Sequence, residues 1–195
     1  MTRVFITGCD KKTEWQLPWF KANFEKHMPN ENLVVYDFNK GSQAGWFNKP
    51  ATMLHASKKY DQVCWLDTDC EIRGDISDIW DTVQDNTLGM VEDIPWSMRR
   101  GSTWYNSGVV AFKKTPEILR IWDQLIKKNT ISVGDQEVLH DYLNIGLHNL
   151  MYITPLNNRY NALRLQIQDN TLPRNISVMH WTGKKGDVEI KRQIG

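Results

Sequence analysis

The chain has 195 residues, with 24 Lys and Arg residues against 23 Asp and Glu residues, for a net charge of +1. This length predicts one domain, covering residues 1–195. A near-zero net charge argues against nucleic acid or an anionic membrane surface as a partner. Hydrophobic residues make up 41% of the chain, which is typical of globular proteins and argues against disorder, and the count of 9 Trp is unusual.

The cysteines and the N-terminal segment indicate the compartment. Cys9, Cys64 and Cys70 lack the spacing of a disulfide framework, and we expect Cys9 and Cys64 to be small core residues. Residues 1–7 become polar too early for a signal peptide, and no apolar stretch approaches the roughly 18 residues of a membrane span. We therefore expect a cytoplasmic protein without a membrane span.

The first third of the chain alternates strand-like and helix-like segments. The predicted order is strand, helix, strand, helix, strand, over residues 3–7, 18–27, 33–38, 46–60 and 62–66. This order is typical of an α/β protein with a parallel sheet. In such sheets ligands bind just beyond the carboxyl ends of the strands.

The rest of the chain is predicted to continue with shorter elements. A helix begins at Thr115 as the N-cap, with Pro116 at the first helical position. We expect a loop over 92–105 and a polar, lysine-containing tail over 182–195. The other predicted elements are strands over 87–91, 109–112, 150–153 and 176–180, and a helix over 135–143.

Two carboxylates follow the third predicted strand directly. Asp67 and Asp69 stand at positions i and i+2 of an extended segment, which places both on one side. Such a pair suits Mn²⁺ or Mg²⁺, which can bridge the oxygens of a diphosphate. The alternative is two solvated aspartates that open a loop.

His180 follows the last predicted strand and precedes Thr182-Gly183-Lys184-Lys185. A neutral imidazole could complete a Mn²⁺ site that two carboxylates begin, and Lys184 and Lys185 could hold phosphate charge. The alternative is a core histidine beside a solvated tail, since His180 would face the same side of the predicted strand as the apolar Ile176 and Val178.

Two further motifs carry polar groups. Asn106 belongs to an Asn-Ser-Gly that enters an apolar strand, where it could bond a sugar hydroxyl or a phosphate, or simply form a turn. Asp135 and Gln136 could bind a hydroxyl or act in catalysis at the mouth of a site. Alternatively, Ser132 with Asp135 starts a helix in the manner of a capping box.

The order of these motifs resembles glycosyltransferase family 8, the family of glycogenin and the bacterial lipopolysaccharide galactosyl- and glucosyltransferases. The series is D-x-D, then N-S-G-V-x-x-F, then G-D-Q, then H-x-x-G, and the resemblance extends from the first strand to Lys185. It implies a GT-A (Rossmann-like) fold with a mixed, mostly parallel sheet flanked by helices. It also implies retaining transfer from a nucleotide sugar, usually UDP-linked, to a hydroxyl acceptor with Mn²⁺.

The resemblance assigns roles to individual residues. Asp67, Asp69 and His180 are the expected metal ligands, and Asp135 and Gln136 are the expected catalytic pair. Apart from the resemblance, Asp93, Trp96 and Trp104 in the predicted loop over 92–105 could contact the acceptor or the sugar, or the two tryptophans could pack the loop onto the core. The expected donor-binding residues are Thr7, Asp10, Lys49, Asp67, Asn106, Lys184 and Lys185.

The sequence departs from the family in one motif. The family usually places a lysine six residues after the histidine, followed by Pro-Trp, whereas this chain has Gly186 there and lacks Pro-Trp. Two other functions compete with glycosyl transfer. One is a phosphatase of the haloacid dehalogenase type, which also has a D-x-D after a strand. The other is a non-catalytic protein that binds a nucleotide sugar or a glycan.

Overall fold

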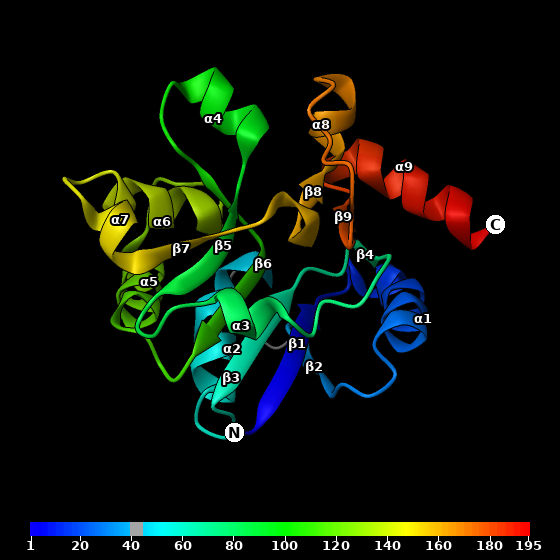
Figure 1. Ribbon diagram of the computed structural model, residues 1–195, viewed down its shortest axis with the longest axis horizontal. Helices are drawn as coiled ribbons and strands as arrows, with labels where there is room; N and C mark the ends of the chain where they lie inside the picture. Colours follow the sequence, from blue (N-terminus) through cyan, green and yellow to red (C-terminus); the bar gives the residue numbers. More distant parts are fainter. Residues whose placement is uncertain (40–44) are drawn as a thin grey trace.

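A six-stranded sheet forms the centre of the molecule in the computed structural model, which describes residues 1–39 and 45–195 (Figure 1). The strand order is β2-β1-β3-β6-β5-β7. Strands β2, β1 and β3 are parallel, β6 is antiparallel to both β3 and β5, and β7 is parallel to β5. The bounds are β1 (Arg3–Cys9), β2 (Leu33–Asp37), β3 (Gln62–Leu66), β5 (Leu88–Glu92), β6 (Tyr105–Lys113) and β7 (Ile153–Leu156).

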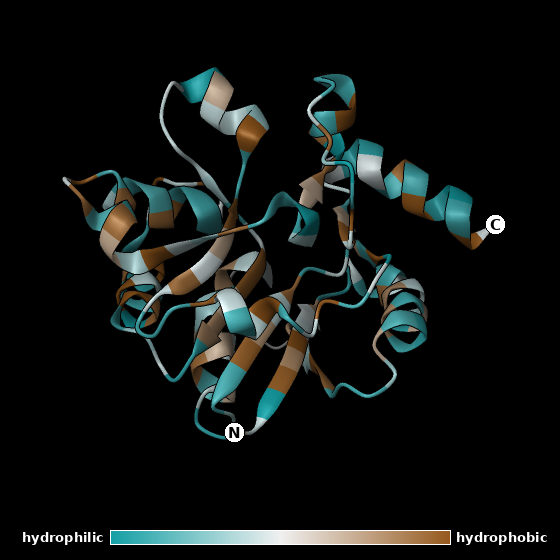
Figure 2. Ribbon diagram, in the orientation of Figure 1, coloured by the Kyte–Doolittle hydropathy of each residue, from teal (hydrophilic) through white to brown (hydrophobic). Residues whose placement is uncertain are grey.

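Helices cover both faces of this sheet, because side chains alternate along each strand. Phe5 of β1 packs in one core with α1 (Leu17–His27) and α3 (Ile79–Thr82). Its neighbours Val4 and Ile6 pack in a second core with α2 (Lys49–Ala56) and α5 (Glu117–Lys128). In Figure 2 the central strands carry the brown, hydrophobic residues of these two cores. The expected α/β class and mixed, mostly parallel sheet flanked by helices are confirmed.

A second sheet of three strands, in the order β4-β9-β8, lies beside the first. Strand β9 (Val178–His180) is antiparallel to β4 (Cys70–Ile72) and parallel to β8 (Ala162–Leu163). The register pairs Cys70 with His180, so the histidine lies beside the segment that leaves the D-x-D motif. This small sheet joins three segments that are far apart in the sequence.

The other helical segments fill the edges of the fold. Helix α6 (Asp135–Leu143) was predicted correctly. The remaining segments are α4 (Ile94–Arg100), α7 (His148–Tyr152), α8 (Arg164–Gln168), α9 (Gly183–Ile194) and the 3-10 turns η1 (Glu14–Gln16), η2 (Gly45–Asn48) and η3 (Asn158–Tyr160). Within residues 1–39 and 45–195, no helix combines the length and the apolar character that crossing a bilayer requires. Cys9, Cys64 and Cys70 are all buried and unpaired, all in the described part of the chain.

Three predicted elements differ from the structure. The expected loop over 92–105 contains α4, because Asp93 accepts a hydrogen bond from the Trp96 backbone N–H at 3.1 Å and caps the helix. The expected tail over 182–195 is almost entirely α9, which Ile190, fully buried, anchors to the core. The expected strand over 150–153 is displaced toward the C-terminus: residues 150–152 end α7, and β7 begins at Ile153.

Two boundaries also differ. Strand β6 begins at Tyr105, so the Asn-Ser-Gly motif lies inside the strand and not before it. Helix α5 begins at Glu117 because Pro116 is extended, with φ −63° and ψ 147°, and is itself the N-cap. The Thr115 hydroxyl lies 3.0 Å from the Ser57 hydroxyl and caps no helix.

Candidate active site

A cavity of about 590 Å³ opens where β1 and β3 end. Asp67 and Asp69 line it, and the backbone N–H of Asp67 donates to Gly108 O of β6 at 2.8 Å, which fixes the start of the motif. The other lining residues among those described are Gly8, Asp10, Lys12, Thr13, Gln16, Phe38, Gly45, Trp46, Trp65, Thr68, Gly183, Lys184 and Asp187. The carboxyl ends of the parallel strands therefore hold the site, as the α/β pattern predicted.

Lys49 is the buried cation of this site. Its Nζ lies 3.0 Å from Asp67 Oδ1 and 3.2 Å from Asp135 Oδ2, and it donates to Ser107 O at 2.9 Å. The side chain is 2% exposed. Burial alone would lower the pKa of Lys49, but the carboxylates of Asp135 and Asp67 raise it, so the ammonium stays charged.

The two carboxylates beside Lys49 differ in protonation tendency. Burial would raise the pKa of Asp67, but Lys49 and His180 lower it below its ordinary value, helped by a hydrogen bond from Trp65 Nε1 at 2.6 Å. For Asp135 the effect of burial is larger than the effect of the Lys49 charge, so the pKa of Asp135 is raised. Lys49 therefore joins the predicted metal ligand Asp67 to the predicted catalytic residue Asp135.

His180 faces the D-x-D carboxylates. Its Nε2 lies 3.0 Å from Asp69 Oδ1 and 3.8 Å from Asp67 Oδ2. The close approach depends on Gly108, since a Cβ at that position would lie 2.1 Å from His180 Cε1. The structure therefore brings together the three residues that sequence analysis expected to bind a metal.

The donor set fits a divalent ion. Neighbouring ligand atoms around an octahedral ion with bonds of about 2.1 Å lie about 3 Å apart, which matches the 3.0 Å between His180 Nε2 and Asp69 Oδ1, whereas Asp67 Oδ2 is more distant at 3.8 Å. One carboxylate from each aspartate and one imidazole suit Mn²⁺ or Mg²⁺. Cys70 Sγ is also near Asp69 and His180, but burial raises the pKa of this thiol well above its usual value, so it remains a poor ligand.

Asn106 connects the site to α4. Its Nδ2 donates to Asp93 Oδ2 at 3.1 Å, and burial raises the pKa of Asp93. Gln136 Oε1 accepts the Ser107 backbone N–H at 3.1 Å, next to Asn106. Asp93, Asn106 and Gln136 therefore lie in one connected cluster behind the metal ligands.

The remaining expected donor contacts lie at different depths. Asp10 and Lys184 line the cavity, whereas Lys185 is exposed and is not among the described residues that line it. Thr7 is fully buried, and its hydroxyl has no hydrogen-bond partner within the described residues. The departure at Gly186 has a structural cause, because a Cβ there would lie 1.6 Å from Trp181 O. A lysine at 186 is therefore incompatible with this conformation of α9.

The two tryptophans of α4 and its flank differ in exposure. Trp96 is 40% exposed, and the Arg100 guanidinium lies 5.1 Å from its ring centroid. Trp104 is 7% exposed and stacks on His140 with ring centroids 4.2 Å apart, while Arg100 lies 4.8 Å from its ring. We therefore expect Trp104 to hold α4 on the body of the protein, and we expect Trp96 to be the tryptophan that can meet a sugar.

The pH dependence of the free energy of unfolding should report the lowered pKa of the buried His140. This side chain is fully buried and accepts the Tyr105 N–H at 2.7 Å, and burial lowers its pKa from 6.5 to about 4. The unfolded chain then binds the proton first, so His140 costs stability as the pH falls below 6.5. We expect a loss of about 2 kcal/mol between pH 7 and pH 5 from this group.

Urea unfolding of the wild type and of His140→Gln at the two pH values measures this effect. Titration of the other groups cancels in the difference between the proteins. Equal pH slopes for both would contradict the assignment.

Sequence reasoning missed several residues of the site. Ser107 binds Lys49 through its carbonyl and its hydroxyl, at 2.9 and 3.1 Å. Gln16 accepts from Thr68 Oγ1 at 2.6 Å and donates to Asp187 Oδ1 at 2.9 Å, which ties α9 to the D-x-D segment. Asn161 contacts both Asn106 and His180. The local sequence around Gln16 and Asn161 carries no motif that marks them.

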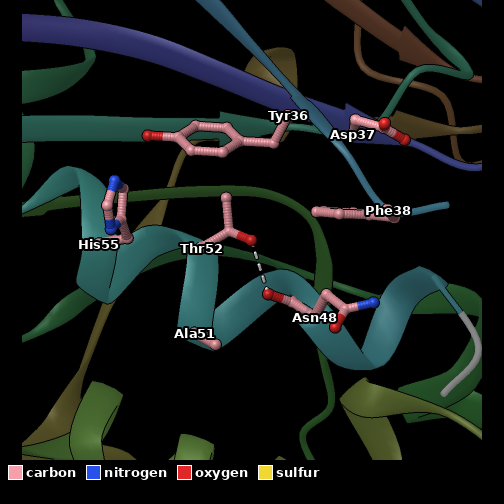
Figure 3. Close-up of a pocket in the computed structure, with 7 residues that line it drawn as sticks. All are labelled: Tyr36, Asp37, Phe38, Asn48, Ala51, Thr52 and His55. Atoms are coloured by element: carbon pink, nitrogen blue, oxygen red, sulfur yellow. Dashed lines mark hydrogen bonds between the residues drawn. The ribbon is translucent and has the colours of Figure 1, made fainter. Parts of the chain in front are cut away.

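A smaller hollow of about 330 Å³ lies between β2 and α2 (Figure 3). Its lining residues are Tyr36, Asp37, Phe38, Asn48, Ala51, Thr52 and His55. Thr52 Oγ1 donates to Asn48 O at 2.8 Å within α2. Phe38 lines both cavities. Asp67 and Asp69 line only the larger one, and His180 and Lys49 are buried next to these two aspartates.

Solved glycosyltransferases share this fold. A glycosyltransferase involved in glycosylation of the major capsid of PBCV-1 matches with a TM-score of 0.71 and 15% identity, over 98% of this chain and 100% of that one. The galactosyltransferase LgtC, in complex with donor and acceptor sugar analogs, matches with a TM-score of 0.59 and 14% identity, over 96% and 92%. GlyE of Streptococcus pneumoniae TIGR4 matches with a TM-score of 0.61 and 16% identity, over 93% of this chain and 55% of GlyE.

Comparison by sequence finds no such relatives. No protein-family model matches the chain, and no curated protein matches it significantly. At the identities above, the likeness to solved structures establishes the fold. The chain therefore has the GT-A fold of these glycosyltransferases.

Proposed function

We propose that the protein is a metal-dependent glycosyltransferase that moves a sugar from a nucleotide-sugar donor, most simply a UDP-sugar, to a hydroxyl acceptor with retention of configuration. The observation that carries the proposal is that Asp67 and Asp69 line a 590 Å³ cavity and that the buried His180 lies directly beside both of them. The fold supports it, since the solved neighbours are glycosyltransferases and LgtC was solved with donor and acceptor sugar analogs.

Asp67, Asp69 and His180 would hold Mn²⁺ or Mg²⁺. When bound, such an ion supplies Lewis-acid stabilisation of the negative charge on a departing nucleoside diphosphate. Lys12 and Lys184 also line the cavity and add positive charge for the diphosphate. The lining therefore holds two lysines together with the D-x-D carboxylates, Asp10 and Asp187, and this mixture of charges suits a diphosphate bound with a cation.

The buried lysine is proposed to organise the site and not to contact the donor. The Lys49 side chain is 2% exposed, and its Nζ lies within 3.2 Å of Asp67, Asp135 and Ser107. It holds Asp67 for the metal and Asp135 for the sugar. Asp135 and Gln136 are proposed to stabilise the oxocarbenium-like charge that develops on the sugar as the leaving group departs.

The acceptor is proposed to approach between α4 and the cavity. In Figure 1 α4 projects from the body at the carboxyl end of β5. Trp96 of α4 offers an exposed aromatic face, and Asp93 begins the helix. An acceptor hydroxyl that attacks from the face of the departing diphosphate gives retention of configuration.

The phosphatase alternative is not favoured, because the solved neighbours of this fold are glycosyltransferases. The decisive experiment offers UDP-, GDP- and other nucleotide sugars with Mn²⁺ or with EDTA. We expect turnover of one donor class only with the metal. A ligand at 100 times its Kd should also raise the free energy of unfolding by about 2.7 kcal/mol. Tight binding without turnover would instead identify a non-catalytic nucleotide-sugar protein, and phosphate release from phosphomonoesters would reject the proposal.

A further inference from the structure

The hydrogen-bond pattern around the second nitrogen of His180 points to an additional positioning residue. His180 Nδ1 lies 3.0 Å from Asn161 Oδ1 and 3.1 Å from Asn106 Oδ1. All three side chains are buried, with exposed fractions of 4% for His180, 0% for Asn161 and 7% for Asn106. The ring is therefore held from the side opposite to Asp67 and Asp69.

The orientation of Asn106 follows from its other partners. Its Oδ1 accepts the backbone N–H of Gly108 at 2.9 Å, and its Nδ2 donates to Asp93 Oδ2 at 3.1 Å. A backbone N–H can only donate, and an ionised carboxylate can only accept. The oxygen of the Asn106 amide therefore faces His180.

The orientation of Asn161 follows in turn. Its Nδ2 donates to Asn106 Oδ1 at 2.9 Å, which leaves Oδ1 as the atom that faces the histidine. Two acceptor oxygens thus surround His180 Nδ1, and this nitrogen must carry the proton. Nε2, which faces Asp69 and Asp67, is then the nitrogen that would offer its lone pair to an ion held with these carboxylates, and Nδ1–H is the tautomer that such an imidazole needs.

We infer that Asn161 is a positioning residue that fixes the Nδ1–H form and the ring orientation of His180. Asn106 Oδ1 already accepts hydrogen bonds from the Gly108 N–H and from Asn161 Nδ2. Asn161 Oδ1, in contrast, accepts from His180 Nδ1. Asn161 also reaches the site from the start of β8, a segment outside every motif of the sequence. The inference rests on the proposed function for its purpose, which is metal binding by His180.

The test compares Asn161→Leu with the wild type and with Thr154→Val. Thr154 is also a buried hydrogen-bonding side chain, 2.6 Å from Thr87 Oγ1, but it is not in contact with His180 in the described structure. The control therefore loses a comparable buried polar contact. Where leucine does not fit, Asn161→Ala removes the same bonds with a smaller side chain.

The first readout needs no metal. In ¹⁵N-labelled protein, we expect the Nδ1–H of His180 to give a slowly exchanging proton resonance in the wild type and in Thr154→Val. The resonance should shift and exchange faster in the Asn161 variants. An unchanged resonance would overturn the inference, whether or not the enzyme uses a metal.

The second readout is the Kd of Mn²⁺, measured by electron paramagnetic resonance titration. Loss of a side chain that orients a metal ligand typically weakens metal binding by about 10–100-fold. We expect this weakening in the Asn161 variants and not in Thr154→Val. Equal affinity in all three proteins would overturn the positioning role. A wild type that binds no Mn²⁺ but shows the Nδ1–H effect would reject the proposed function and leave the contact to Asn161 established.

Discussion

Replacing Lys49 by methionine is expected to lower the free energy of unfolding by about 3–5 kcal/mol. Methionine keeps much of the length of the side chain but leaves the buried Asp135 and the partly buried Asp67 without their shared cation. Loss of one partner from a buried ion pair is far more costly than loss of a surface pair, because the remaining charge stays out of water. Urea unfolding of the purified proteins measures the change.

A double variant separates charge from packing. Lys49→Met with Asp135→Asn removes one of the two carboxylates that have lost their cation. We expect the double variant to have a higher free energy of unfolding than Lys49→Met alone. Both proteins should lack transferase activity, since Asp67 loses its anchor in each. Additive losses of stability would contradict the idea that Lys49 serves these carboxylates, and wild-type activity in either protein would contradict its role in the site.

Replacing Asp69 by asparagine is expected to lower the rate of glycosyl transfer by about 10²–10³-fold, the usual effect of removing one preorganised electrostatic contact at a leaving group. The fold should be retained, because the Asp69 side chain is only partly buried and its backbone carbonyl still accepts the Trp181 N–H at 2.9 Å. The rate at saturating donor and Mn²⁺ and the Kd of Mn²⁺ are the measurements.

The matched control is Asp85→Asn, which makes the same change of charge on the surface. Asp85 is 62% exposed in a pair with Lys114 and lies in the turn before β5. We expect activity and Mn²⁺ affinity close to those of the wild type. Full activity of Asp69→Asn, or an equal loss in Asp85→Asn, would reject the metal-ligand assignment.

The sequence predicted the parts of the site that depend on local patterns. Residues 62–66 form an apolar strand with Asp67 and Asp69 directly after it, and that order alone places both carboxylates at a sheet edge. His180 was identified because it ends a short strand and stands three residues before Gly183. The places of these residues in the fold are predictable because strand periodicity and turn residues act over a few neighbouring positions.

Contacts that depend on the three-dimensional fold were not predictable. The burial of Lys49 arises because α2 directs its first turn against β3 and β6, and nothing in the residues around Lys49 signals this. Asn161 reaches His180 only because β8 pairs with β9. The sequence left two roles open for Trp104, sugar contact or packing onto the core, and the ring is buried against His140 because the predicted loop contains α4.

The pairing of Cys70 with His180 in the small sheet has a consequence for how the protein gains and loses its structure. An ion held by Asp69 and His180 would act as a cross-link that closes a loop of more than half the chain. Because the two ligands are so far apart in the sequence, an unfolded chain seldom brings them together and binds the ion weakly, so the ion would stabilise the folded chain by mass action. The ion would thus make unfolding of the two sheets a single event, and a chain that has not yet placed β9 beside β4 would be unable to retain it.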